Sequence, residues 1–170
     1  MNPARRRAIA VLSLAGLPRA GLAGVAYPDV LSGTSIEFPR DHGSHPDFRT
    51  EWWYVTGWTT DASDVARGVQ VTFFRNRPGI AESSASAFAP RELLFAHAAI
   101  ADAGIGRLVH DQRAARAGFG LASASTSTTD VRLDDWSLVR EGDRYRACVR
   151  ARDFAIDLAF AATQPVLLQG

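Results

Sequence analysis

The sequence predicts an all-β protein, an antiparallel β-barrel or a partly open barrel or sandwich, and three observations support this class. Short apolar and aromatic runs recur, and their side chains alternate between two faces as they do in strands. Turn-forming residues separate these runs at short intervals. No run keeps a helical period with capping residues at both ends. Short strands at hairpin spacing are typical of antiparallel barrels and sandwiches.

The first two strands are expected at Glu51–Thr60 and Gly68–Asn76. The polar segment 61–64 between them reads as a hairpin turn. Within the second run, Val69, Val71 and Phe73 alternate with residues that include Gln70 and Thr72, which is typical of a strand with one buried face.

The later elements follow the same pattern. Residues 76–90 read as a loop rich in Pro, Gly, Ser and Ala, and the Ser/Thr segment 123–129 reads as an exposed loop or edge. The remaining strands are expected at 93–101, 107–114, 131–140, 144–151 and 154–161, with turns around 102–106, 141–143 and 152–153.

The N-terminus predicts an export signal over residues 1–26. Three arginines at 5–7 precede ten apolar residues, Ala8 to Leu17, and small residues near Ala23 or Ala26 suit signal cleavage. Ten apolar residues are too few to span about 30 Å of hydrocarbon, which argues against a membrane anchor. We therefore expect an exported, periplasmic or secreted protein with a single domain at residues 27–170, by either the Sec or the twin-arginine route.

Charge and cysteine content exclude several functional classes. All 19 basic residues are arginines, and they are scattered among acids rather than gathered in the basic stripe that nucleic acid requires. The region after residue 26 carries 15 arginines and 18 acids, so its net charge is −3. Cys148 is the only cysteine, which excludes an intrachain disulfide and suits a buried, inert thiol.

The aromatic run at residues 51–58 is the main candidate site. In a strand, Glu51, Trp53 and Val55 face one side, whereas Trp52 and Tyr54 face the other. Large aromatics either fill the closed end of a barrel or line a pocket for an apolar ligand. We expect both tryptophans to be mostly buried on opposite faces of the strand, one inside the barrel and one against a covering segment.

Glu51 allows two interpretations. A carboxyl group that loses hydration against tryptophan keeps its proton more easily, as a general acid requires. Alternatively, Glu51 pairs with Arg49, Arg75 or Arg77 and holds the strand, and this is the interpretation we favour because buried acids are usually paired.

The histidines give weaker signals. His97 lies in an apolar strand, on the face opposite Leu94 and Ala96, where a structural role is more common than a role in a pocket. His42 and His45 flank a Gly-Ser loop beside two aspartates, but zinc sites need three or four converging ligands. We expect no metal and no cofactor, and a role for these two residues in stabilising the loop or at a pocket rim.

The run from His45 to Gly57 (HPDFRTEWWYVTG) resembles the signature of the lipocalin-like AttH/CrtC family, which includes carotenoid 1,2-hydratase and an AttH component associated with an ABC-transport cluster. Further matches follow in the family's order at residues 69–75, 95–99, 110–113, 117–120 and 164–170. The resemblance covers about residues 36–170. It implies a lipocalin-like β-barrel as the first of two tandem domains, with the second domain absent from this chain.

These observations lead to a combined expectation. The chain is expected to bind a hydrophobic small molecule, such as an isoprenoid, carotenoid or other lipid-like compound, through His45, Trp52, Trp53, Tyr54 and Phe73. In an enzymatic version, Glu51 protonates an isolated alkene, the aromatic faces stabilise the cation and His97 positions water; we do not expect this fragment to be active. The expected partners are the second lipocalin-like domain and ABC-transport components. The alternative is a structural or interaction domain whose aromatics form only a core.

Overall fold

The computed structural model describes residues 24–167 and contains two antiparallel sheets. The first sheet has the order β1-β2-β3-β4, and the second has the order β5-β6-β7-β8-β9. One short 3-10 helix, η1 (Arg40–His42), precedes them. The strand bounds are β1 (Thr50–Thr60), β2 (Ala66–Asn76), β3 (Leu93–Asp102), β4 (Arg107–Arg116), β5 (Ala122–Ala124), β6 (Asp130–Leu133), β7 (Trp136–Glu141), β8 (Arg144–Arg150) and β9 (Ala155–Ala161).

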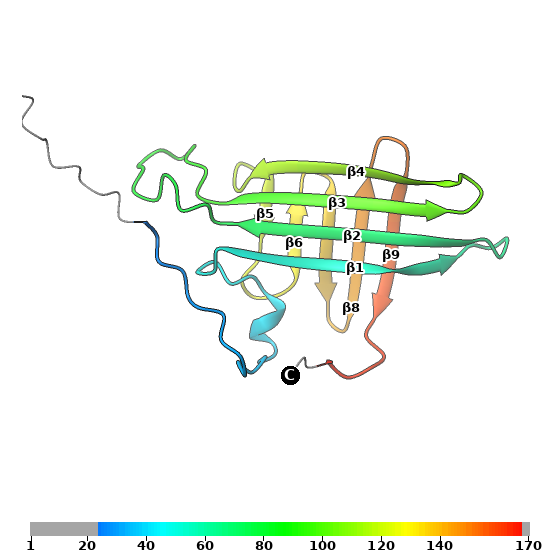
Figure 1. Cartoon of the computed structure of the whole chain (residues 1–170), viewed down its shortest axis with the longest axis horizontal. Helices are drawn as coiled ribbons and strands as arrows, with labels where there is room; N and C mark the ends of the chain where they lie inside the picture. The colour runs from blue at the N-terminus through cyan, green and yellow to red at the C-terminus, as the bar shows by residue number, and fades with distance from the viewer. Residues whose placement is uncertain (1–23, 168–170) are drawn as a thin grey trace, which may run out of the picture.

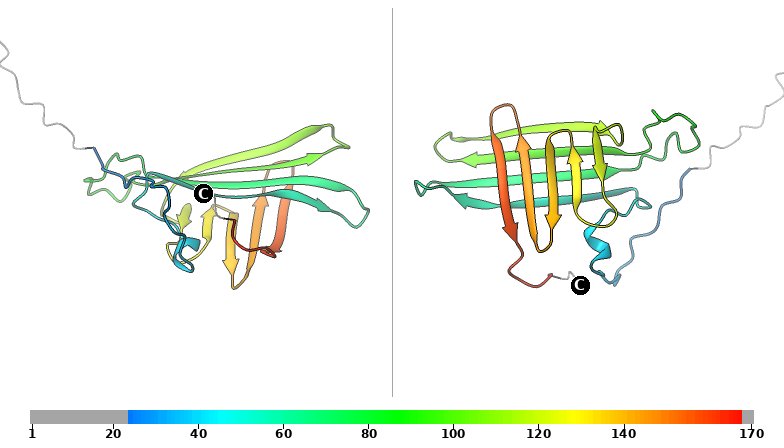
Figure 2. Two further views of the ribbon diagram at one scale, coloured as in Figure 1. Left: turned by 60° about the horizontal axis from the view of Figure 1, so that its bottom comes forward. Right: turned by 180° about the vertical axis from the view of Figure 1, so that it is seen from behind.

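The two sheets pack face to face with their strands crossing, as Figures 1 and 2 show. This arrangement confirms the predicted all-β class in its partly open form, because the sheets do not close into a barrel. The predicted hairpin signals were also correct, since segment 61–65, which contains the predicted turn 61–64, joins β1 to β2, and segment 103–106 joins β3 to β4. The export signal expected at residues 1–26 lies almost entirely outside the described residues.

The core lies between the sheets and takes alternate residues from each strand. In the first sheet, Trp53, Phe73 and Ala96 are register partners whose side chains face the second sheet. Burying such apolar area stabilises the fold by about 25 cal/mol per Å². The fully enclosed members of the core are Val71, Phe73, Leu94, Ala96, Ala98, Val131, Leu133, Trp136, Leu138, Ala147 and Val149.

The run predicted as one strand at residues 131–140 is two strands, β6 and β7. Asp134 interrupts it with a φ of 56°, a left-handed conformation that aspartate adopts more readily than most residues. Leu133 and Trp136 then pair directly across the turn. Segment 123–129, expected as a loop or edge, contributes part of the edge strand β5.

The expectation that Trp52 and Trp53 are both mostly buried was wrong. Trp53 faces the second sheet and packs against the core, whereas Trp52 faces away and is 59% exposed. Within residues 24–167, no segment buries this side of β1, so the alternation that predicted two faces does not by itself bury the second face.

Candidate functional site

An open cleft of 740 Å³ lies at one side of the sandwich, where β1 faces the ends of β7, β8 and β9. The strand β1 is an edge of the first sheet, so the space beside it is not filled by a further strand. We call this space the aromatic cleft. Its lining residues include Phe38, His42, Trp52, Trp53, Tyr54, Val55, Leu138, Arg140, Tyr145, Phe160 and Val166.

Strand register brings one wall of the aromatic cleft together. Arg140, Tyr145 and Phe160 are register partners across β7, β8 and β9, so they form a row on the same face of the second sheet. The rings of Tyr145 and Phe160 are stacked with centroids 5.3 Å apart. Trp53 and Val55 of β1 form the opposite wall.

His42 lies at the polar end of the aromatic cleft. Its ring stacks on Phe38 at 4.2 Å between centroids, and its Nδ1 lies 3.4 Å from the hydroxyl of Tyr145. Loss of hydration lowers the pKa of His42, and the positive charge of Arg140 lowers it further. The imidazole is therefore uncharged at neutral pH.

Backbone contacts with the segment between β5 and β6 fix the position of His42. The Thr129 hydroxyl donates a hydrogen bond of 2.8 Å to the carbonyl of His42, and the Ser44 N–H donates one of 2.7 Å to the carbonyl of Ser125. Between these contacts, Gly43 approaches the Thr126 carbonyl so closely that a Cβ at this position would lie 2.2 Å from its oxygen. The segment therefore needs glycine here to place His42 in the aromatic cleft.

Glu51 and His45 line a second cleft, of 580 Å³, between the start of β1 and residues 30–36. The backbone N–H of His45 donates hydrogen bonds to both carboxylate oxygens of Glu51, at 3.0 and 2.8 Å. Arg75 donates from Nε to the same carboxylate at 2.5 Å. The imidazole of His45 bridges Glu51 and Asp41, at 3.2 and 3.1 Å.

This network gives Glu51 the geometry of the ion-paired interpretation rather than that of a free acid. Its carboxylate is occupied by a guanidinium and a backbone N–H, and it does not line the aromatic cleft. Asp41, which lines both clefts, has a pKa well below its usual value because it accepts hydrogen bonds from Arg40 and the Glu37 N–H. Asp41 is therefore ionised at neutral pH, and the carboxylate of Glu51 is taken up by its contacts with Arg75 and His45.

The remaining predicted residues do not gather at one site. Trp52, Trp53 and Tyr54 line the aromatic cleft, but Phe73 is fully buried in the core. His97 faces the outer side of the first sheet, with its ring 5.6 Å from that of Phe74. Glu51 faces the inner side of that sheet, so the structure does not bring Glu51 and His97 together.

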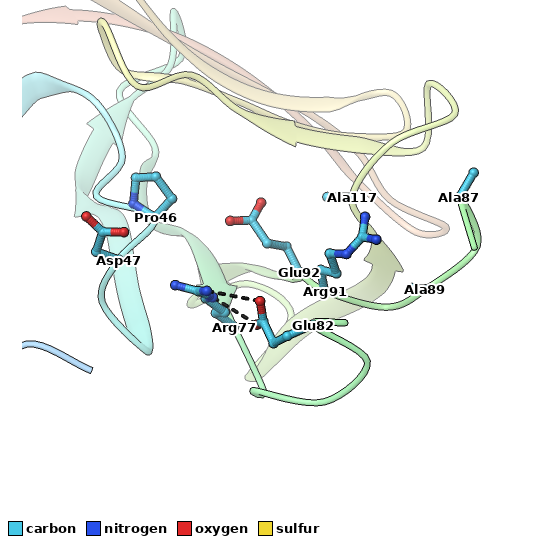
Figure 3. A pocket seen from close by; sticks show the side chains of 9 residues that line it. All are labelled: Pro46, Asp47, Arg77, Glu82, Ala87, Ala89, Arg91, Glu92 and Ala117. Carbon is cyan, nitrogen blue, oxygen red and sulfur yellow. Dashed lines mark hydrogen bonds and ion pairs between the residues drawn. The ribbon is translucent and has the colours of Figure 1, made fainter. Parts of the chain in front are cut away.

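A third hollow, of 480 Å³, lies between the loop after β2 and the start of β3 (Figure 3). In it Arg77 forms two hydrogen bonds with Glu82, at 2.9 and 3.0 Å, and these hold the pKa of Glu82 below its usual value. Figure 3 also shows Glu92, whose carboxylate accepts a hydrogen bond from Arg75. Three acids and two arginines line this hollow, and none of the predicted site residues lines it.

Sequence reasoning missed Arg140, Tyr145 and Phe160 as site residues. They lie about 90 residues after the aromatic run, and only the crossing of the two sheets brings them opposite it. The alternation within the runs 144–151 and 154–161 gave a signal for which residues share a face. Nothing in the sequence showed which end of that face stays open.

The described part of the chain gives two further results. Within residues 24–167, no group of three or more His, Cys, Asp or Glu side chains is placed to hold a metal ion. Among the same residues, no helix has the length and apolar character needed to cross a membrane.

Two of three comparisons with known proteins gave a match. The model of the AttH-like family matches residues 29–170. The crystal structure of a candidate AttH from Nitrosomonas europaea is similar over 88% of this chain, with 47% sequence identity and a TM-score of 0.71. This chain spans 43% of the length of that protein. The comparison with curated proteins gives no match.

Proposed function

The chain belongs to the AttH-like family, and from this premise we propose that it binds a hydrophobic small molecule in the aromatic cleft. One observation carries the proposal: six aromatic residues from both sheets and from the segment around η1 line one open volume of 740 Å³, with Trp52 and Tyr54 at its exposed edge. A volume of several hundred Å³ lined by apolar rings with a few polar groups is typical of small-molecule sites. An isoprenoid, a carotenoid end group or another lipid-like chain suits such walls.

The proposed activity is binding rather than alkene hydration. Hydration at an isolated alkene needs a protonated acid beside the ligand, and the carboxylate of Glu51 is instead paired with Arg75 outside the aromatic cleft. His97, the residue expected to position water, faces the outer side of the first sheet. Any resemblance to carotenoid 1,2-hydratase therefore supports the class of ligand better than it supports the reaction.

A titration with a fluorescent lipid probe tests this function. We expect saturable binding by the purified chain, and a loss of about tenfold in affinity for Phe160→Ala, which corresponds to about 1.4 kcal/mol of lost contact. Trp58→Ala is the control, because Trp58 is an aromatic residue on a strand, as Phe160 is, but it is exposed and does not line the cleft. Equal weakening by both substitutions, or no saturable binding at all, would contradict the proposal.

A second candidate function is a protein-interaction domain, and the outer face of the first sheet favours it. Trp52, Tyr54, Trp58, Phe95 and Leu108 are exposed there. An exposed apolar patch of several hundred Å² usually marks an interaction site. The partner we propose is a second lipocalin-like domain, which is consistent with the greater length of the related protein from Nitrosomonas europaea.

We also propose that the protein is exported and works beside ABC-transport components. The arginines and the apolar run in residues 1–26 support export, and the family resemblance supports the transport association. Fractionation of cells that express the full chain tests the first point. A protein retained in the cytoplasm with residues 1–26 intact would contradict it.

A further inference from the structure

We propose that the aromatic cleft selects an amphipathic ligand that ends in a carboxylate, and that Arg140 binds this carboxylate with help from Tyr145. The inference rests on the proposed binding function and specifies the chemistry of the ligand. It follows from the hydrogen bonding of Arg140, its register partners and the charges of its neighbours.

Arg140 is partly buried, and its guanidinium forms few hydrogen bonds with the rest of the described chain. Only 21% of its side chain is exposed, and among the described residues its guanidinium has one hydrogen-bond partner, Asp143 at 3.4 Å. By contrast, Arg77 and Arg146 each make two hydrogen bonds to one carboxylate, all at 3.0 Å or less. A guanidinium carries five donors in a planar fork that matches a carboxylate. Arg140 therefore keeps donors available for a ligand.

The contact with Asp143 does not satisfy Arg140. The side chain of Asp143 is fully exposed to water, and solvated surface pairs of this kind contribute little. A carboxylate inside the cleft would meet the same guanidinium in a less polar setting, where charge-assisted hydrogen bonds are stronger. A ligand carboxylate can thus displace Asp143 at low cost.

The residues that pair with Arg140 on the adjacent strands place a polar hydroxyl next to an apolar ring. Across β7, β8 and β9 the row runs from the Arg140 guanidinium to the Tyr145 hydroxyl and then to the Phe160 ring. Trp53 and Leu138 continue the apolar lining. A ligand with its carboxylate at Arg140 and Tyr145 would lay its hydrocarbon chain along these side chains.

Arg140 supplies the positive charge of the aromatic cleft. Among the described residues that line the aromatic cleft, Arg140 is the only permanent cation, and His42 beside it is uncharged at neutral pH. Two carboxylates also line the cleft. Asp41 is already bound to Arg40 and His45, and Asp143 is fully exposed to water and makes only the 3.4 Å contact with Arg140. An ester or alcohol oxygen can accept only neutral-acceptor hydrogen bonds from Arg140, whereas a carboxylate forms stronger, charge-assisted hydrogen bonds and can accept two from the planar guanidinium.

Two probes with the same chain and a different end group test the inference. We would titrate the purified protein with 11-(dansylamino)undecanoic acid and with its methyl ester, at a pH where the acid is ionised. We expect the acid to bind at least about tenfold more tightly, and higher salt to weaken the acid but not the ester. Equal affinities would overturn the inference and leave the proposed binding function intact, while binding of neither probe would overturn both.

Matched variants assign the preference to Arg140. Arg140→Gln should remove the preference by weakening the acid alone, whereas Arg144→Gln should leave it unchanged, because Arg144 is at the same end of the sheet but does not line the cleft. Equal weakening of acid and ester by Arg140→Gln would overturn the proposal. If that variant does not fold, Tyr145→Phe takes its place: loss of part of the preference supports the assignment, and no change overturns it.

Discussion

At the scale of single residues, Arg75 organises the segment that leads into the first sheet. Its side chain is fully buried and donates hydrogen bonds to the carbonyls of His45 and Phe48, both at 2.8 Å. It also contacts the carboxylates of Glu51 and Glu92. A buried charge is stable only when it is paired and hydrogen-bonded. Arg75 meets both conditions and holds the loop before β1 against two strands.

Breaking the pair from one side should therefore cost more than replacing both partners. We expect Glu51→Ala to lower the free energy of unfolding by about 3 kcal/mol, because the buried guanidinium loses its main counter-charge. The double variant Glu51→Gln with Arg75→Met should be less destabilised than the sum of the two single variants. Urea unfolding of the unchanged protein, Glu51→Gln, Arg75→Met and the double variant measures this coupling. Additive losses would show that the pair does not act as a unit.

His42 should make stability depend on pH. Its pKa is lowered in the folded protein, chiefly by burial and then by Arg140, so the unfolded chain takes up a proton that the folded chain resists. Stability should be complete above the unfolded value of 6.5 and should fall as the pH drops below it, levelling off below the folded pKa.

The measurement compares unfolding by urea at about pH 7.5 and about pH 5.5. His42→Gln should show a smaller loss between these two conditions than the unchanged protein. His110→Gln is the control, since His110 lies exposed on the outer face of β4. An unchanged loss in His42→Gln would exclude this residue as the source of the pH dependence.

At the scale of elements, the sequence predicted strands well and their environment less well. Alternation in β1 and β2 correctly predicted which residues share a face, because side-chain direction along a strand is a local property. The turn at Asp134 was missed because the residues on both sides of it have strand character. The exposure of Trp52 was missed because it depends on whether another segment covers that face.

The connection between η1 and the second sheet depends on Gly43. We expect Gly43→Ala to destabilise the protein by about 2 kcal/mol, because the new methyl group must displace the Thr126 backbone. The same change should weaken binding of the lipid probe, since His42 would leave its place in the aromatic cleft. Gly57→Ala is the control, because a Cβ at Gly57 meets nothing within 4 Å. Thermal unfolding and probe titration test both effects, and equal results for the two variants would argue against a positioning role for this contact.

At the scale of the whole molecule, the aromatic cleft results from how the two sheets cross. Its walls come from β1, from three strands of the other sheet and from the segment before β1; Figure 1 shows the crossing of the two sheets. Local patterns predicted three of the rings, Trp52, Trp53 and Tyr54. The opposite wall could not be predicted, because no local rule states which residues of a distant hairpin lie across an open edge. The same limit applies to Arg140, because its sequence position does not show how few hydrogen bonds its guanidinium makes in the folded chain.

The outer face of the first sheet is the other feature of the whole molecule. Its four central rows of register partners are Trp52-Phe74-Phe95-Ala114, Tyr54-Thr72-His97-Gln112, Thr56-Gln70-Ala99-His110 and Trp58-Gly68-Ala101-Leu108. None of these residues is an arginine, aspartate or glutamate. Surfaces of this kind promote association, because no charge opposes contact with another apolar face.

We therefore expect the isolated chain to self-associate through this face. Sedimentation velocity at about 5 and about 100 µM should show a rising mean mass, since burial of each Å² of apolar surface contributes about 25 cal/mol. Replacing Trp58 and Leu108 with serine should lower the association at nearly unchanged stability, because both side chains are more than half exposed. Ile80→Ser removes an exposed apolar side chain away from this face and serves as the control. A monomer at both concentrations would contradict the prediction. If Ile80→Ser lowers the association equally, the contact between chains lies elsewhere on the surface. The exposed Val166 and Leu167 would then be the next residues to test.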